Sequence, residues 1–138
     1  MKKLNVAVLM GGKSAEHEIS LITGREVAKN LNPRRYNVLP IVISKDGLTF
    51  KLNNKKYSFG QLLTVNCQLF FIAMHGPNGE DGKVQGFLDL IGVPYTGSGV
   101  LASALGMDKI YSSPWYGQNI LENFICSSRP YSSRKCHC

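Results

Sequence analysis

An apolar run that ends in two glycines constrains the fold of this chain more than any other feature. Residues 5–10 read NVAVLM, a pattern typical of a strand that is buried on both faces of a parallel sheet. Gly11 and Gly12 follow, and residues 18–31 then favour a helix. The apolar residues of this segment recur at near-helical spacing: Ile19, Ile22, Val27 and Leu31. Strand, glycine turn and helix together predict the start of a βαβ unit.

The expected first helix carries a start signal and a stop signal. Ser14 is expected as the N-cap, with Glu16 and Glu18 in the first turn, where acidic side chains complement the helix dipole. Asn32 and Pro33 are expected to end the helix.

Further apolar runs continue the alternation. Pro40 argues for a sheet edge or a bulge at its position, since proline cannot donate to a strand ladder. The expected elements are strands at 36–44, 68–74 and 93–97, a polar hairpin at 45–59, and helices at 82–92 and 99–109. The second helix should bury one face made of Val84, Phe87, Leu88 and Ile91. This order predicts an α/β fold with a parallel sheet, flanking helices and right-handed crossovers.

Charge and composition exclude several classes. The chain has 138 residues and a net charge of +7, but its Lys and Arg are scattered through loops and form no stripe with interleaved aromatics. No nucleic-acid partner is therefore expected, and an anionic small ligand suits the charge equally well. No apolar run has the length of a membrane span, and the N-terminal run does not read as a signal peptide, so a cytoplasmic protein is expected. Cys136 and Cys138 lack the second cysteine pair of a zinc site, so no metal site is expected.

Polar loops follow three of the expected strands. They read GGKSAEHE at 11–18, HGPNGEDG at 75–82 and TGSG at 96–99. Since ligands of parallel α/β sheets bind beyond the carboxyl ends of the strands, these loops are expected to form one rim with a site. Adjacent residues in a helix point in different directions, so at most two residues of 16–18 can face a shared pocket. Each loop also has a purely structural interpretation. The acids of 11–18 can complement the helix dipole, 75–82 can be a solvated turn around His75, and 96–99 can serve close packing.

In their order and separation, two stretches resemble one family. VLMGGKSAEHEISLITG (8–24) and HGPNGEDGKVQGFLDLIGVPYTGSGVLASALGMDK (75–109) are similar to the N-terminal domain of D-alanine–D-alanine ligases, ATP-grasp enzymes of peptidoglycan synthesis. The resemblance runs from about Asn5 to Lys109. It implies a Rossmann-like pre-ATP-grasp domain, ligation of two D-alanines through an acyl phosphate, and a homodimer that pairs through this domain. It also implies ATP and Mg²⁺, whose main binding residues are expected in domains that this chain lacks.

The resemblance implies three residue roles. Glu16 matches the acid that holds the ammonium group of the first D-alanine, which makes it the expected catalytic and substrate-binding residue. His75 matches a residue beside the same substrate, and Lys109 matches a lysine that reaches the ATP phosphates. The chemistry suits these positions, because a carboxylate binds ammonium through charge-assisted hydrogen bonds and a lysine acts on phosphate as a point charge.

The resemblance ends just after Lys109. Residues 1–111 are therefore expected to form the substrate-binding domain, and residues 112–138, rich in paired serines and in cysteine, an irregular tail that is disordered or translated out of frame. The alternative function is a truncated, non-catalytic α/β remnant that binds a small ligand weakly or dimerises. A nucleotide-binding Rossmann protein is less consistent with the sequence, which lacks the GxGxxG turn and places Asp46 too late for a ribose contact.

Overall fold

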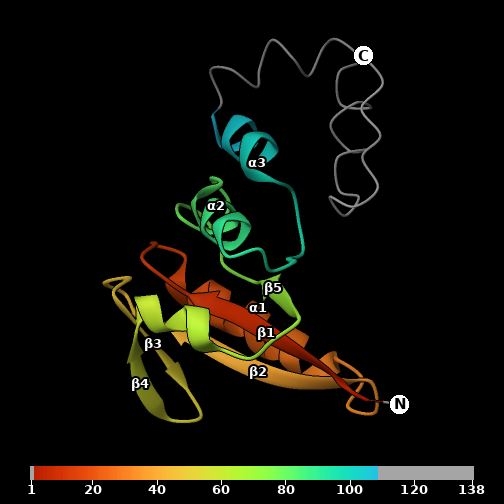
Figure 1. Cartoon of the computed structure of the whole chain (residues 1–138). Coiled ribbons are helices and arrows are strands. Elements are labelled where there is room, and N and C mark those ends of the chain that lie inside the picture. Colours follow the sequence, from red (N-terminus) through yellow and green to blue (C-terminus); the bar gives the residue numbers. More distant parts are fainter. Residues whose placement is uncertain (1, 109–138) are drawn as a thin grey trace, which may run out of the picture.

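Strand β1 (Leu4–Gly11) lies between two parallel neighbours in a five-stranded sheet (Figure 1). The computed structural model describes residues 2–108. Its strand order is β4–β3–β2–β1–β5, with β2 (Tyr36–Ile43) and β5 (Leu69–Ile72) parallel to β1. Residues 6–10 are at most 1% exposed, which confirms the prediction of a strand buried on both faces.

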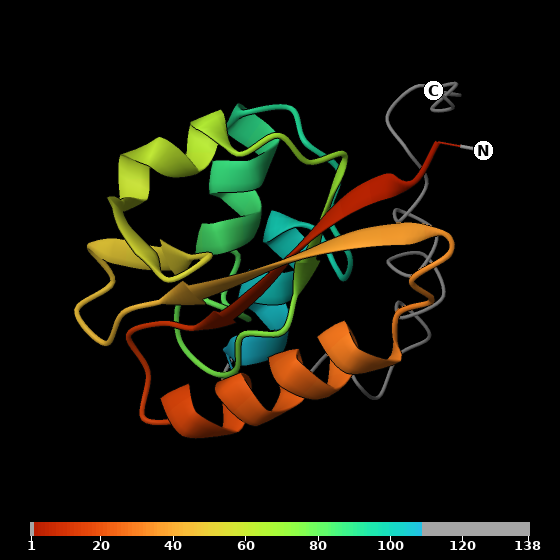
Figure 2. The same cartoon turned by 90° about the horizontal axis from the view of Figure 1, so that it is seen from below.

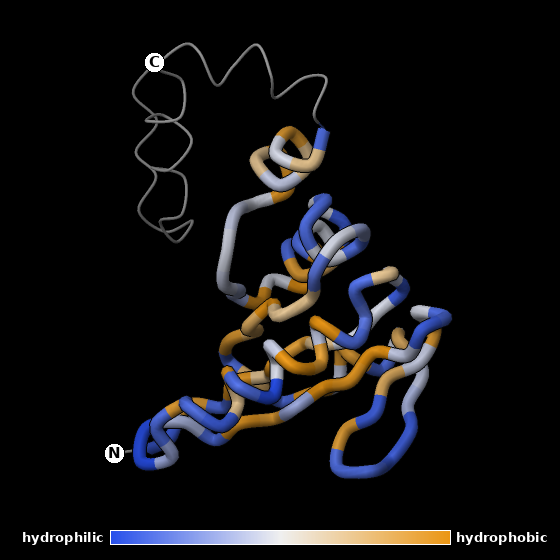
Figure 3. Tube along the Cα trace, turned by 180° about the vertical axis from the view of Figure 1, so that it is seen from behind, coloured by the Kyte–Doolittle hydropathy of each residue, from blue (hydrophilic) through white to orange (hydrophobic). Residues whose placement is uncertain are grey.

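Two hydrophobic cores lie on opposite faces of this sheet, and Figure 2 shows the helices that lie along these faces. Helix α1 (His17–Asn30) connects β1 to β2 and covers one face, where Val6, Val8 and Met10 point. The other face receives Ala7 and Leu9, because side chains alternate along a strand. This face is covered by α2 (Lys83–Leu90) and the 3-10 helix η1 (Phe59–Thr64). In Figure 3, hydrophobic residues (orange) follow the trace along the central strands of the sheet.

The predicted hairpin is confirmed as β3 (Thr49–Leu52) and β4 (Lys55–Ser58). Asn53 and Asn54 turn it with φ values of 51° and 62°, as expected of a two-residue hairpin loop. Strand β3 pairs with β2 at two positions only, Val42 and Ile43. Pro40 therefore has a neighbour on the β1 side alone, which confirms the prediction of an edge at that position.

Helix α2 begins and ends close to the predicted range, and its predicted inner face is confirmed. Val84 and Leu88 are buried, and Phe87 and Ile91 pack against the same core. Helix α3 (Val100–Met107) follows. The strand expected at 93–97 is reduced to a single parallel bridge between Phe70 and Tyr95.

The N-cap predicted for α1 was wrong. Glu16, and not Ser14, occupies the N-cap position, and the Ser14 hydroxyl instead accepts the Glu16 backbone N–H at 3.0 Å. Of the apolar residues at helical spacing, Val27 and Leu31 pack against the core, whereas Ile19 and Ile22 are 54% and 61% exposed. The residues that α1 buries are His17, Ser20, Leu21 and Gly24. Gly24 lets the helix approach β1 so closely that a Cβ there would lie 2.6 Å from the Met10 Cβ.

None of the helices within residues 2–108 combines the length and the apolar character needed to cross a bilayer. Lys109 and the tail predicted for 112–138 lie outside the described residues.

Candidate functional site

The loops that follow β1 and β5 contact each other at the carboxyl edge of the sheet. Asn78 Nδ2 in the second loop donates to the Lys13 carbonyl in the first at 3.0 Å. The loop at 96–98 lines a cavity together with His75 and Glu80. The three polar loops therefore gather at one edge, as predicted.

Gly76 in the second loop lies close to the first loop. Its φ is +71°, a left-handed conformation that favours glycine. A Cβ at this position would lie 2.8 Å from Ser14 Oγ and 3.3 Å from Glu16 Oε1. The missing side chain thus lets the Glu16 carboxylate lie against the backbone next to His75.

The three polar residues at the start of α1 point in different directions. His17 is 7% exposed, and its Nδ1 lies 2.7 Å from the Gly12 carbonyl, to which it donates. Glu18 is exposed and pairs with Lys45 at 2.9 Å, and the hydrogen bond and charge of Lys45 lower its pKa. Glu16 makes no ion pair or side-chain hydrogen bond with any residue between 2 and 108. One residue of the three therefore faces the second loop with an uncommitted carboxylate.

Ser20 ties this edge of the sheet to α1. Its side chain is fully buried; its Oγ accepts the Gly11 N–H at 2.8 Å and donates to the Ala73 carbonyl at 2.8 Å. These two backbone groups lie at the ends of β1 and β5, so one hydroxyl links both strands and the helix. This role of Ser20 was not predicted, because its only signal in the sequence is a hydroxyl within the apolar stretch ISLI.

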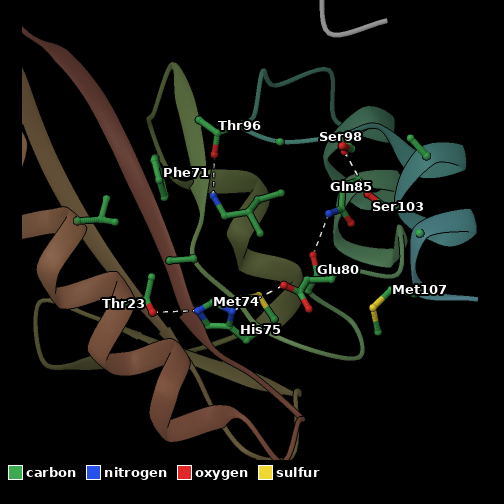
Figure 4. Close-up of a pocket in the computed structure, with 17 residues that line it drawn as sticks. Thr23, Phe71, Met74, His75, Glu80, Gln85, Thr96, Ser98, Ser103 and Met107 are labelled. Atoms are coloured by element: carbon green, nitrogen blue, oxygen red, sulfur yellow. Dashed lines mark hydrogen bonds and ion pairs between the residues drawn. The ribbon is translucent and has the colours of Figure 1, made fainter. Parts of the chain in front are cut away.

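The ring of His75 has a polar neighbour on each side (Figure 4). Nε2 lies 2.9 Å from Thr23 Oγ1 on α1, and Nδ1 lies 3.7 Å from Glu80 Oε1. The other oxygen of Glu80 accepts the Gly76 N–H at 2.8 Å. Glu80 thus folds the loop back on itself, and the direct hydrogen bond of the imidazole is the one to Thr23 on α1. Thr23 and Glu80 are further site residues that the sequence analysis did not name.

A cavity of about 560 Å³ opens beside this histidine, between β5, α1 and α3. Its volume lies within the range of small-molecule pockets. Gln85 lines it and is 4% exposed; its Nε2 donates to the Gly79 carbonyl at 2.8 Å. Its Oε1 is buried without a hydrogen-bond partner among the described residues. Glu16 does not line this cavity, so the structure brings His75 into the cavity and leaves Glu16 on the far side of Gly76.

Asp81 fixes the end of the same loop where α2 begins. Its Oδ1 accepts the Lys83 N–H at 3.2 Å, and its Oδ2 accepts from Lys83 Nζ at 2.7 Å. Burial acts to raise the pKa of Asp81, but hydrogen bonds from Lys83 and Asn78 and the charge of Lys83 outweigh it, so the pKa is lowered from its ordinary value.

The lowered pKa of Asp81 predicts a loss of stability in acid. A carboxylate whose folded pKa is depressed contributes stability that is present above its unfolded pKa and is lost as the pH falls through the folded value. Asp81→Asn keeps an acceptor for Lys83 but carries no charge, so its unfolding free energy should depend less on pH between about pH 5 and pH 2. At neutral pH the two proteins should differ by less than about 1 kcal/mol, because Lys83 is exposed. Urea unfolding across this pH range measures both effects, and parallel curves would contradict the prediction.

The described residues do not fit a magnesium site. Within residues 2–108, no group of three His, Cys, Asp or Glu side chains is arranged to hold a metal ion. Lys109, the expected phosphate contact, lies outside the described residues. What this edge offers is a free carboxylate, an oriented imidazole and a small cavity, which suit an amino acid or another small zwitterion.

Comparisons with known proteins point to one group of enzymes. The family model described as "D-ala D-ala ligase N-terminus" matches residues 5–66 and 53–98. The D-alanine–D-alanine ligase of Desulforudis audaxviator is 50% identical over 105 residues, which cover 76% of this chain and 31% of that protein. The ligase of Leptospira interrogans is 39% identical over 128 residues, covering 75% of this chain and 36% of that protein. The chain thus spans about a third of the length of these relatives.

Solved structures agree with this result. The Bacillus anthracis D-alanine–D-alanine ligase complexed with ATP has 33% identity and a TM-score of 0.67, with 83% of this chain and 36% of that chain covered. The VanG D-Ala:D-Ser ligase of Enterococcus faecalis has 27% identity and a TM-score of 0.73, with 84% and 42% covered. Both similarities rest on an α/β unit like the one described above.

Proposed function

The chain belongs to the D-alanine–D-alanine ligase family, as a form of its N-terminal domain, and from this membership we propose that its described edge binds the first D-alanine of an ATP-dependent ligation. The ligation joins two D-alanines into the dipeptide used for peptidoglycan. In this proposal Glu16 binds the ammonium group, and His75 contacts the same amino acid.

The observation that carries the proposal is the uncommitted carboxylate of Glu16. The neighbouring acids of the rim are engaged: Glu18 with Lys45, Glu80 with the Gly76 N–H, and Asp81 with Lys83. Glu16 stands exposed against Gly76 without a side-chain partner in the described region. A free carboxylate beside two glycine-containing loops is suited to an ammonium group, which it binds through charge-assisted hydrogen bonds.

The residues of this chain would bind and orient the amino acid. ATP supplies the phosphoryl group that activates the carboxylate of the first D-alanine, and the amine of the second D-alanine then attacks the acyl phosphate. Such transfer depends mostly on positioning and on charge neutralisation, usually with Mg²⁺. Because residues 2–108 do not fit Mg²⁺, we assign them no step that uses the metal. We extend the proposal to Lys109 as a contact of the ATP phosphates, on the family resemblance alone.

The proposal also covers the cellular location and the oligomeric state of the domain. We extend the proposal to a cytoplasmic location and to pairing of two copies through this domain, on the family resemblance alone. Ile19 and Ile22, which are exposed on α1, offer apolar surface that suits such pairing.

Titration with D-alanine tests the proposed binding. Adding D-alanine to the ¹⁵N-labelled chain should shift the amide signals of Gly76 and of the first turn of α1 in a saturable way, with L-alanine as the control ligand. Absence of saturable shifts at these positions, or equal shifts with L-alanine, would contradict the proposal. A coupled assay of ADP release with ATP and D-alanine answers a separate question: turnover shows that the 138-residue chain ligates by itself, and binding without turnover supports the non-catalytic alternative.

A further inference from the structure

We propose that Thr23 is a positioning residue, whose hydroxyl bond to Nε2 of His75 fixes the ring so that Nδ1, beside Glu80, is the atom offered to the ligand. The inference deepens the proposed function and rests on it where ligand affinity is concerned. Its structural part, the state of the histidine ring, can be measured without any ligand.

The contact joins two elements that are distant in sequence. Thr23 lies in the middle of α1, and His75 follows β5, 52 residues later. Thr23 Oγ1 and His75 Nε2 are 2.9 Å apart, and both residues line the cavity (Figure 4). Ser20 holds the helix to the sheet through two hydrogen bonds. The Thr23 hydroxyl therefore has a fixed position from which it can orient the His75 ring.

The opposite side of the ring indicates where the proton lies. Glu80 Oε1 is 3.7 Å from Nδ1, and the other Glu80 oxygen is held by the Gly76 N–H at 2.8 Å. A carboxylate only accepts hydrogen bonds, so it favours a proton on the nitrogen that it faces. A threonine hydroxyl can donate or accept, and it can therefore donate to an unprotonated Nε2. In the neutral ring, the arrangement assigns the proton to Nδ1.

This tautomer has a consequence for binding. A separation of 3.7 Å is too long for a direct hydrogen bond, so Glu80 leaves the Nδ1–H capacity unfilled. Nε2, in contrast, is already engaged by Thr23. A ligand oxygen, such as a carboxylate oxygen of an amino acid, would therefore meet the Nδ1–H edge of the ring.

Ring ¹⁵N spectra of the whole chain test the tautomer directly. The spectra are recorded at a pH at which the imidazoles are neutral, and His75→Gln identifies the His75 signals by their disappearance. In the wild type, His75 should show the Nδ1–H tautomer. Thr23→Val removes the hydroxyl while keeping the branched shape, and it should shift the population toward Nε2–H. Thr23→Ser restores the hydroxyl and should restore the wild-type spectrum.

Affinity for D-alanine provides the second measurement. Loss of one hydrogen bond that orients the ring should weaken binding about 5- to 10-fold in Thr23→Val, whereas Thr23→Ser should stay within about 2-fold of the wild type. In a His75→Gln background, Thr23→Val should cause no further loss, because the hydroxyl acts through His75. Circular dichroism checks that each variant is folded, and Thr23→Ala replaces Thr23→Val if the latter is not.

The outcomes separate this inference from the proposed function. An Nε2–H tautomer in the wild type, or ring signals unaffected by Thr23→Val, would overturn the positioning role whatever the affinity. If the tautomer responds as expected and Thr23→Val binds D-alanine like the wild type, the role in binding is refuted. If the wild type itself binds no D-alanine, the proposed function fails, and the ring spectra alone then decide how Thr23 acts on His75.

Discussion

Replacing Ser20 with alanine is expected to lower the free energy of unfolding by about 2–5 kcal/mol, because two buried backbone groups would lose their partner at once. The hydroxyl accepts the N–H of Gly11 and donates to the carbonyl of Ala73, each at 2.8 Å, and Ser20 is 0% exposed. Urea unfolding of the two proteins measures the difference.

Ser103→Ala is the matched control for this change. Ser103 is also a buried serine in a helix, but its hydroxyl makes a single hydrogen bond of 3.3 Å, to the Ser98 carbonyl. Its loss should cost less than about 1 kcal/mol. If Ser20→Ala destabilises the protein no more than Ser103→Ala does, the link between β1, β5 and α1 does not depend on the Ser20 hydroxyl.

Hydrogen exchange extends the test to the site. The groups that Ser20 bridges lie where β1 and β5 run into the two contacting loops. Ser20→Ala should therefore speed the exchange of amides at this edge, including the Gly11 N–H, more than that of amides in the β3–β4 hairpin.

The sheet was predictable because its signals are local. The run at 5–10 alternates its side chains between two cores, and no polar residue after Asn5 interrupts it. The Asn53–Asn54 turn and Pro40 likewise act through their own backbone geometry. The order of these elements then predicted that the polar loops would meet at one edge.

Apolar spacing indicated the inner face of α1 only in part. Val27 and Leu31 pack against the core, but Ile19 and Ile22 are exposed. The buried residues of α1 also include Gly24, which lets Met10 pack closely against the helix, and Ser20, whose hydroxyl bonds to the ends of two strands. Gly24 and Ser20 are required because the backbones of α1 and β1 lie close together. The spacing of hydrophobic residues in the sequence does not reveal this requirement.

The side chains that contact His75 could not be predicted from the sequence either. The loop of His75 was predicted as part of the site, but Thr23 lies 52 residues away and reaches His75 only through the tertiary fold. Glu80 belongs to the same loop, yet its role depends on the turn at Gly76, which brings its carboxylate to the Gly76 N–H. The assignment of a ligand to Glu16 came from the resemblance; the structure adds that its carboxylate is free within the described region.

Replacing Glu16 with glutamine is expected to raise the dissociation constant for D-alanine about 10- to 100-fold, since a hydrogen bond to a charged group is worth about 1.5–3 kcal/mol. The side chain keeps its shape and loses only its charge. Because Glu16 is exposed and has no side-chain partner within residues 2–108, the free energy of unfolding should change little. Titration with D-alanine and urea unfolding of the same samples measure the two quantities.

Glu18→Gln is the matched control for this prediction, because it removes the same charge two residues away at the start of the same helix. Both variants lose one negative charge near the N-terminus of α1, so any general effect on the helix dipole is common to them. Glu18 is engaged by Lys45 in an exposed pair, which contributes little to stability. Affinity should therefore remain within about 2-fold of the wild type in Glu18→Gln and fall only in Glu16→Gln. Equal losses in the two variants would mean that D-alanine responds to the charge of the loop as a whole, and unchanged binding in Glu16→Gln would remove Glu16 from the site.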